Sequence, residues 1–148
     1  MTSTTGTQQS LPARRTLLLV AGDVVALLIF AALGRRSHGA AAGLAALGET
    51  AITALPFIAG WLSVAPLAGA FSPHTTNGVG PMLRTVLIGW SGALLVGAVL
   101  RAAMIGRFSP VSFYVVTFLV ALLILGGWRA VFALIEGRNT PYAHSDRR

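Results

Sequence analysis

The sequence predicts an all-α protein: a four-transmembrane-helix bundle with antiparallel neighbours and polar, disordered tails. Of the 148 residues, 55% are hydrophobic and only 10% are charged, whereas a soluble domain has about 25% charged residues. Four apolar runs are each long enough to cross a hydrocarbon core of about 30 Å as a helix. They are too long for barrel strands, and polar and apolar residues do not alternate along them.

The first two spans lie on either side of the sequence "RRSHGAAAGLAA". The first span is predicted at about residues 16–34, because its apolar run begins after one pair of arginines and ends before another. The second span is predicted at about residues 47–71. Pro56 and Pro66 each remove a backbone donor from this span, so we expect it to bend.

The last two spans are joined by the short sequence "GRFSP". We expect them at about residues 83–105 and 111–135, and so short a connection makes them antiparallel neighbours. The four spans form a single membrane domain, residues 14–136. An N-terminal tail, residues 1–13, is predicted to be disordered, and residues 137–148 form a polar C-terminal tail.

The charged residues are distributed as in a membrane protein rather than a nucleic-acid-binding protein. All 11 basic residues are arginine, and together with abundant alanine and glycine this bias suggests a GC-rich prokaryotic genome. The net charge is +7, but the arginines lie singly or in pairs at the ends of apolar runs, which is typical of membrane anchoring. More of them lie on the side of the two termini. We therefore expect a multi-pass protein of the plasma membrane with both termini in the cytoplasm.

The sequence contains no evident catalytic or metal-binding motif. The absence of cysteine excludes disulfides and thiolate metal sites. His38, His74 and His144 lie in separate polar segments, so they do not form a three-ligand metal site. No nucleophile–base pair or phosphate-binding loop is visible. The chain is therefore predicted not to be an enzyme and to bind no metal, cofactor or nucleic acid.

Asp23 is the costliest residue of the first span, because a lone charge near the bilayer centre costs about 2.5–3.5 kcal/mol on insertion scales. Arg129 lies at a similar predicted depth in the fourth span, so we predict that it pairs with Asp23. Arg84 is the second choice of partner. In the alternative interpretation, Arg129 extends to the headgroups beside Trp128.

A second pair of charges is expected at the other side of the membrane. Gly89, Ala93 and Gly97 recur every four residues and predict a close packing stripe, which Arg101 continues. Arg101 is therefore predicted to contact Glu49 of the second span, with Arg35 as a competing partner. In the alternative, Glu49 favours the start of its helix through the dipole and Arg101 extends to the headgroups.

The sequence "GRRSHG" allows two interpretations. Gly34 would end the first helix in a left-handed turn, and the arginines after it would complement the negative helix end. Alternatively, the arginine forks form a site for an anion or a lipid headgroup, with histidine as a titrating neighbour. The residues of this candidate anion site are Arg35, Arg36, Ser37, His38 and Arg107, with Arg101 nearby.

Several motifs together resemble a known family. They are "GDVVALLIFAALGRRSHG", "LPFIAGWLSVAPLAGAF" in the second span, "LRAAMIGR" at the end of the third and "GWR" late in the fourth. Over about residues 16–130 the chain is similar to a family of small four-span prokaryotic membrane proteins of unknown function. The resemblance implies no activity. It implies that these residues match family motifs: Asp23, Arg35, Arg36, Ser37, His38, Trp61, Pro66, Arg101, Arg107, Trp128 and Arg129.

Three functions are compatible with the sequence. The first is a non-catalytic accessory or structural membrane subunit, acting as a homo-oligomer or in a larger membrane complex, whose charges pair its helices. The second is a small proton-coupled transporter or channel that uses Asp23. The third is a protein that binds an anionic lipid or a quinone at Arg35, Arg36, His38 and Arg101. A transporter needs Asp23 to be reachable by water, whereas a structural pair needs it buried and permanently charged.

Overall fold

The computed structural model describes residues 10–37, 44–76 and 78–139. Within these residues the chain forms helices and no strand. Four of the helices are long and apolar enough to cross a membrane, so the prediction of an all-α, four-span bundle is confirmed. The helices are α1 (Ser10–Ser37), α2 (Leu44–Val64), α3 (Pro73–Thr76), α4 (Val79–Ile105) and α5 (Val111–Asn139).

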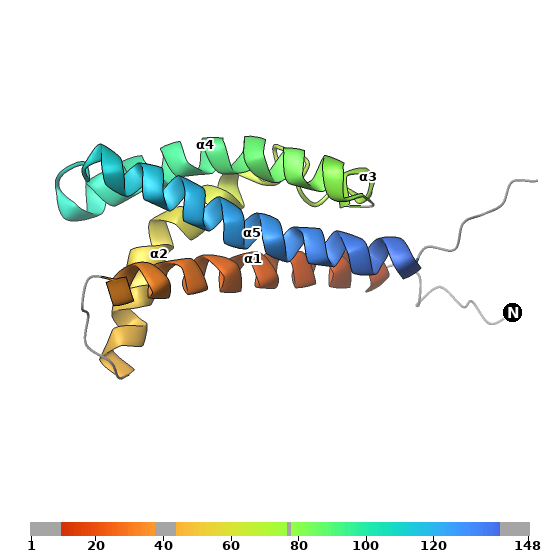
Figure 1. Ribbon diagram of the computed structural model, residues 1–148, viewed down its shortest axis with the longest axis horizontal. Coiled ribbons are helices and arrows are strands. Elements are labelled where there is room, and N and C mark those ends of the chain that lie inside the picture. Colours follow the sequence, from red (N-terminus) through yellow and green to blue (C-terminus); the bar gives the residue numbers. More distant parts are fainter. Residues whose placement is uncertain (1–9, 38–43, 77, 140–148) are drawn as a thin grey trace, which may run out of the picture.

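The helices run back and forth along one long axis (Figure 1). We call the end at which α1 begins and α5 ends the terminal end; α3 lies there too. We call the opposite end, where α1 leads to α2 and α4 leads to α5, the loop end. Helices α1 and α5 lie side by side, α2 crosses the bundle obliquely, and the most extensive packing is between α2 and α4.

Small residues bring α2 and α4 into close contact. Gly89, Ala93 and Gly97 are all buried on α4, as their four-residue spacing predicts. A Cβ atom on Gly97 would lie 2.7 Å from a ring carbon of Phe57, and one on Gly60 would overlap the backbone of Ala93. The two backbones therefore approach as closely as glycine allows.

The second span differs from its prediction, because α2 begins at Leu44 and ends at Val64 instead of covering residues 47–71. Pro66 disfavours a helical conformation in the residue before it. The chain then turns through residues 65–71, where Gly69 adopts a φ of 73°, a left-handed conformation that glycine allows. The turn that replaces the end of the helix contains Ala70, whose carbonyl oxygen takes part in the site described below.

The other helices extend beyond the predicted spans. Residues 10–13, assigned from the sequence to the disordered tail, belong to α1, and α5 continues to Asn139. Gly34 does not end α1 in a left-handed turn, because the helix continues to Ser37. Gly106, with a φ of 72°, ends α4 in that way instead.

Apolar side chains cover the outside of the spans. Leu95, Val99 and Leu123 are 70%, 60% and 76% exposed. Exposure of this kind along helices of spanning length is typical of a surface that faces acyl chains. The chain is therefore a multi-pass membrane protein.

Candidate functional site

A buried ion pair joins α1 to α5. Arg129 donates from Nε to Oδ1 of Asp23 at 2.9 Å and from Nη2 to Oδ2 at 2.5 Å. Both side chains are 0% exposed. The contact is bidentate, the geometry that suits a planar guanidinium and a carboxylate.

The remaining polar atoms of the pair are bound by the other spans. Trp61 of α2 donates from Nε1 to Oδ2 of Asp23 at 2.9 Å. Arg129 donates from Nη1 to the carbonyl oxygen of Ala70 at 2.5 Å and contacts Sδ of Met82, on α4, at 3.6 Å. All four spans thus meet at these two charges, and the carboxylate accepts three hydrogen bonds.

The break after α2 makes one of these contacts available. Ala70 lies in the turn that follows Pro66, and its carbonyl oxygen would be bonded within the helix if α2 continued. Because the chain turns here, that oxygen accepts from Arg129 instead. The ring of Phe71, next in the sequence, lies 5.0 Å from the guanidinium, and the ring of Trp61 lies 5.3 Å from it. Aromatic faces attract a cation at such distances.

Gly22, next to Asp23 on α1, packs against Trp128, next to Arg129 on α5. A Cβ atom on Gly22 would overlap the indole of Trp128, so the missing side chain makes room for that ring. The Trp128 Nε1 atom is buried and finds no acceptor among the described residues. The dipeptides Gly22–Asp23 on α1 and Trp128–Arg129 on α5 therefore fit together as a packing contact and an ion pair side by side.

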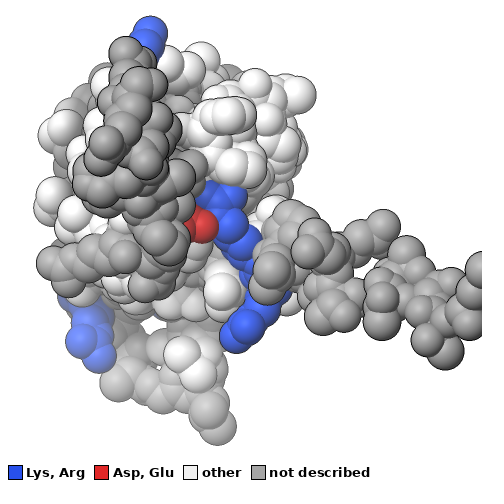
Figure 2. Space-filling model, turned by 90° about the vertical axis from the view of Figure 1, so that its right-hand side faces the viewer, with Lys and Arg blue, Asp and Glu red and all other residues white. Residues whose placement is uncertain are grey.

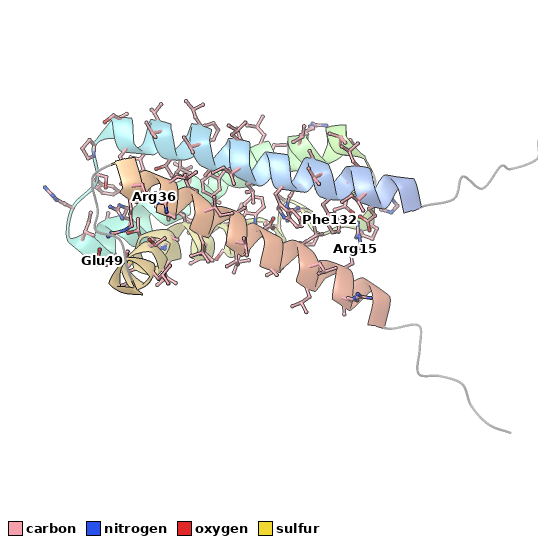
Figure 3. The ribbon with its side chains drawn as sticks, turned by 60° about the horizontal axis from the view of Figure 1, so that its bottom comes forward. Arg15, Arg36, Glu49 and Phe132 are labelled. Atoms are coloured by element: carbon pink, nitrogen blue, oxygen red, sulfur yellow. The ribbon has the colours of Figure 1, made fainter. Side chains whose placement is uncertain are left out.

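A second ion pair between the same helices lies nearer the terminal end. Arg15 of α1 contacts Glu136 of α5 with two nitrogens, one of them Nη2 to Oε2 at 2.8 Å. Figure 3 labels Arg15 at this end, and Figure 2 shows arginine side chains there beside an acidic one. Neither residue was expected to pair from the sequence. The sequence contains the information to predict this pair. If α1 and α5 are antiparallel and residue 23 lies beside residue 129, then residue 15, eight positions earlier, lies close to residue 136, seven positions later.

The loop end differs from the sequence-based prediction. Glu49 pairs with Arg35, the competing partner, and not with Arg101. Figure 3 labels Glu49 at this end, near the last turn of α1. Arg101 instead donates from Nε to Oγ of Ser109 at 3.2 Å, and its guanidinium lies 4.7 Å from the ring centre of Phe113. The connection after α4 supplies the hydroxyl, so Arg101 turns toward its own loop.

A pocket of about 580 Å³ opens at the loop end, and we call it the loop-end pocket. All four spans contribute to its lining, including Arg35 from α1, Thr53 from α2, Arg101 from α4 and Phe113 from α5. Two arginines of the predicted anion cluster are thus on one pocket.

The other predicted site residues do not join these two places. Arg36 and Arg107 are exposed at the loop end and do not line the pocket. The side chain of Ser37 and the whole of His38 lie outside the described residues. Arg84, the second choice of partner for Asp23, is exposed on α4 and is not part of the buried ion pair.

The described residues contain no group of three His, Cys, Asp or Glu side chains that could hold a metal ion. The charged groups that the described residues bring together are the buried Asp23–Arg129 pair and the two arginines of the loop-end pocket.

The chain belongs to a family described as "Protein of unknown function (DUF3054)", whose model matches residues 20–132. The matched range contains the Asp23–Arg129 pair and the arginines of the loop-end pocket, whereas Arg15 and Glu136 lie outside it. Comparison with curated proteins gives no match, and comparison with solved structures gives none either.

Proposed function

We propose that this chain is a non-catalytic membrane protein, an accessory or structural subunit, whose buried Asp23–Arg129 pair permanently holds its four spans together. The observation that supports this role is the saturation of the pair: both side chains are 0% exposed and the carboxylate accepts three hydrogen bonds. Removing either partner would leave an uncompensated buried charge, which costs about 3–5 kcal/mol. Such a pair stabilises one fixed arrangement of the helices and does not suit a site that binds and releases protons or substrates.

A proton-coupled transporter or channel is the alternative function. A carboxylate that exchanges protons must be reached by water on at least one side, since protons arrive through water or through a chain of titrating groups. Asp23 is enclosed by Arg129, Trp61 and buried apolar side chains instead. This enclosure favours the structural role.

The proposed setting is the plasma membrane of a prokaryotic cell with both termini in the cytoplasm. The excess of arginine on the side of the termini supports this orientation. The exposed apolar side chains of the spans would contact lipid, a second copy of the chain or another membrane subunit.

Carbodiimide labelling of the protein in liposomes tests the role of Asp23, because the reagent modifies carboxyl groups that it can reach. Glu49 is an internal control, since its side chain is 61% exposed. We expect peptide mass spectrometry to find Glu49 modified by a water-soluble carbodiimide in the presence of an amine, and Asp23 unmodified over the same time.

A flux measurement completes this test. Liposomes loaded with a pH-sensitive dye should show the same proton leak with the wild-type protein and with Asp23→Asn. Modification of Asp23 as fast as Glu49, or a proton flux that Asp23→Asn abolishes, would contradict the structural role and favour the transporter.

A further inference from the structure

We infer that the loop-end pocket binds the phosphate headgroup of an anionic lipid, with Arg101 and Arg35 as the groups that contact the phosphate. Its volume of about 580 Å³ lies in the range of about 300–1,000 Å³ that is usual for small-molecule sites. The pocket lies at the opposite end of the spans from Asp23, so the inference does not depend on the role proposed for the buried ion pair.

Arg101 is held in place while part of its guanidinium stays available. Its Nε atom donates to Ser109, and Phe113 lies under the guanidinium at 4.7 Å. No acceptor for its two terminal nitrogens occurs among the described residues. A fixed guanidinium with both terminal nitrogens unused is the arrangement that binds phosphate oxygens in pairs.

Arg35 supplies a second positive group with an unused donor. Its Nε atom is buried and has no hydrogen-bond partner among the described residues, although Nη2 contacts Glu49. A buried donor without an acceptor costs about 1–3 kcal/mol. An anion in the pocket would relieve that cost.

The wider charge balance at this end also favours an anion. Arg36, which follows the pocket residue Arg35, is exposed and adds a positive charge at this end. Among the described residues of the loop end, Glu49 is the one acid. The excess of positive charge would raise the local concentration of anionic headgroups.

The shape of the pocket matches a lipid better than a free anion. Phe30, on its wall, precedes Arg35 by five residues and therefore lies roughly 7.5 Å deeper along α1. Val116 of α5 also lines the pocket and is 57% exposed on the outside of the bundle. The pocket thus has arginines near the headgroup level and an apolar wall that faces the acyl chains, as an amphiphilic molecule requires.

Native mass spectrometry of the delipidated full-length protein tests this inference by titration with phosphatidylglycerol, phosphatidylcholine and inorganic phosphate. We expect the wild-type protein to bind phosphatidylglycerol in preference to phosphatidylcholine and to bind inorganic phosphate weakly. Arg101→Gln should weaken phosphatidylglycerol binding about tenfold, the order expected for loss of hydrogen bonds to a charged group.

Arg107→Gln is the matched control, because it removes the same charge at the same end from an exposed side chain that does not line the pocket. It should leave phosphatidylglycerol binding within about twofold of the wild type. An equal loss in Arg101→Gln and Arg107→Gln would show that only surface charge attracts the lipid, and it would overturn the inference.

Two further variants keep the inference testable if Arg101→Gln does not fold. Arg101→Lys retains the charge but loses the fork of donors, so it should bind phosphatidylglycerol more weakly than the wild type. Val116→Trp retains every charge and fills the apolar wall, so it should lower lipid binding while leaving the response to inorganic phosphate unchanged. Equal affinity for phosphatidylcholine, or inorganic phosphate binding as tightly as the lipid, would contradict the assignment.

Discussion

The two ends of the bundle use the same residue types in opposite ways. Toward the terminal end, Asp23 and Arg129 are 0% exposed and their hydrogen-bonding groups face protein partners from every span. At the loop end, Glu49 is 61% exposed, and the two terminal nitrogens of Arg101 have no acceptor among the described residues. Arginine is therefore a fixed structural element in one region and an available binding group in the other.

The two arginines, Arg129 and Arg101, carry the same charge, so the difference comes from how many of their hydrogen-bonding groups have protein partners. A buried ion pair offsets its desolvation only when its geometry is good and its remaining polar atoms are bonded. The turn after Pro66 and the indole of Trp61 provide those bonds for Asp23 and Arg129. Among the described residues, Arg101 has only the Ser109 hydroxyl and the Phe113 ring as partners, so its terminal nitrogens are not saturated in this way.

Breaking the buried ion pair should have the largest effect on stability. Arg129→Leu and Asp23→Asn should each lower the free energy of unfolding by about 3–5 kcal/mol, because each leaves one buried charge or its donors uncompensated. Unfolding in mixed detergent micelles, followed by tryptophan fluorescence, measures this loss. Arg84→Leu is the matched control, an exposed arginine near the same end, and should change stability by less than about 0.5 kcal/mol.

Substitutions at two glycines of α1 test how tightly the two regions are packed, without changing any charge. Gly22→Ala should destabilise the protein by about 1–3 kcal/mol, because the new Cβ atom would overlap the ring of Trp128 beside the ion pair. Gly34→Ala, in the same helix at the loop end, should be neutral or slightly stabilising, since nothing lies within 4 Å of its Cβ position. Thermal unfolding in one detergent measures both variants. A larger loss for Gly34→Ala than for Gly22→Ala would contradict the packing described here.

The two partly exposed ion pairs should give the smallest effects. Glu136→Gln removes the partner of Arg15, and these side chains are 25% and 18% exposed, so a loss of about 0.5–1 kcal/mol is expected. Glu49→Gln should cost less than about 0.5 kcal/mol, because its side chain is 61% exposed and solvent screens the pair. At high salt, the loss of unfolding free energy should become smaller for Glu136→Gln and should disappear for Glu49→Gln. A larger loss for Glu49→Gln would show that the loop end is as rigid as the region around Asp23.

The sequence predicted the four spans because length and apolar composition alone decide them. It also gave a reason to look for a partner of Asp23, since a short carboxylate cannot reach the headgroups and Arg129 lay at similar depth. The end of α2 was misplaced because hydropathy continues past Pro66, whereas the backbone does not remain helical there.

Side-chain direction explains what the sequence could not predict. The hydrogen bond from Trp61 to Asp23 depends on the rotation of both side chains, and no spacing rule encodes it. Arg101 was expected to reach across to Glu49, but Ser109 in its own loop is nearer and Phe113 provides an aromatic face. The loop-end pocket depends on residues from four helices, so it becomes visible only when the helices are placed together.

A double-mutant cycle between residues 23 and 129 tests the central claim most directly. Free energies of unfolding are measured for the wild type, for Asp23→Asn, for Arg129→Leu and for the protein with both changes. We predict that the double change recovers part of the summed loss, with a coupling free energy of about 2 kcal/mol or more. Single variants as stable as the wild type, or losses that add to within about 0.5 kcal/mol, would show that the acid and the arginine do not hold the spans together.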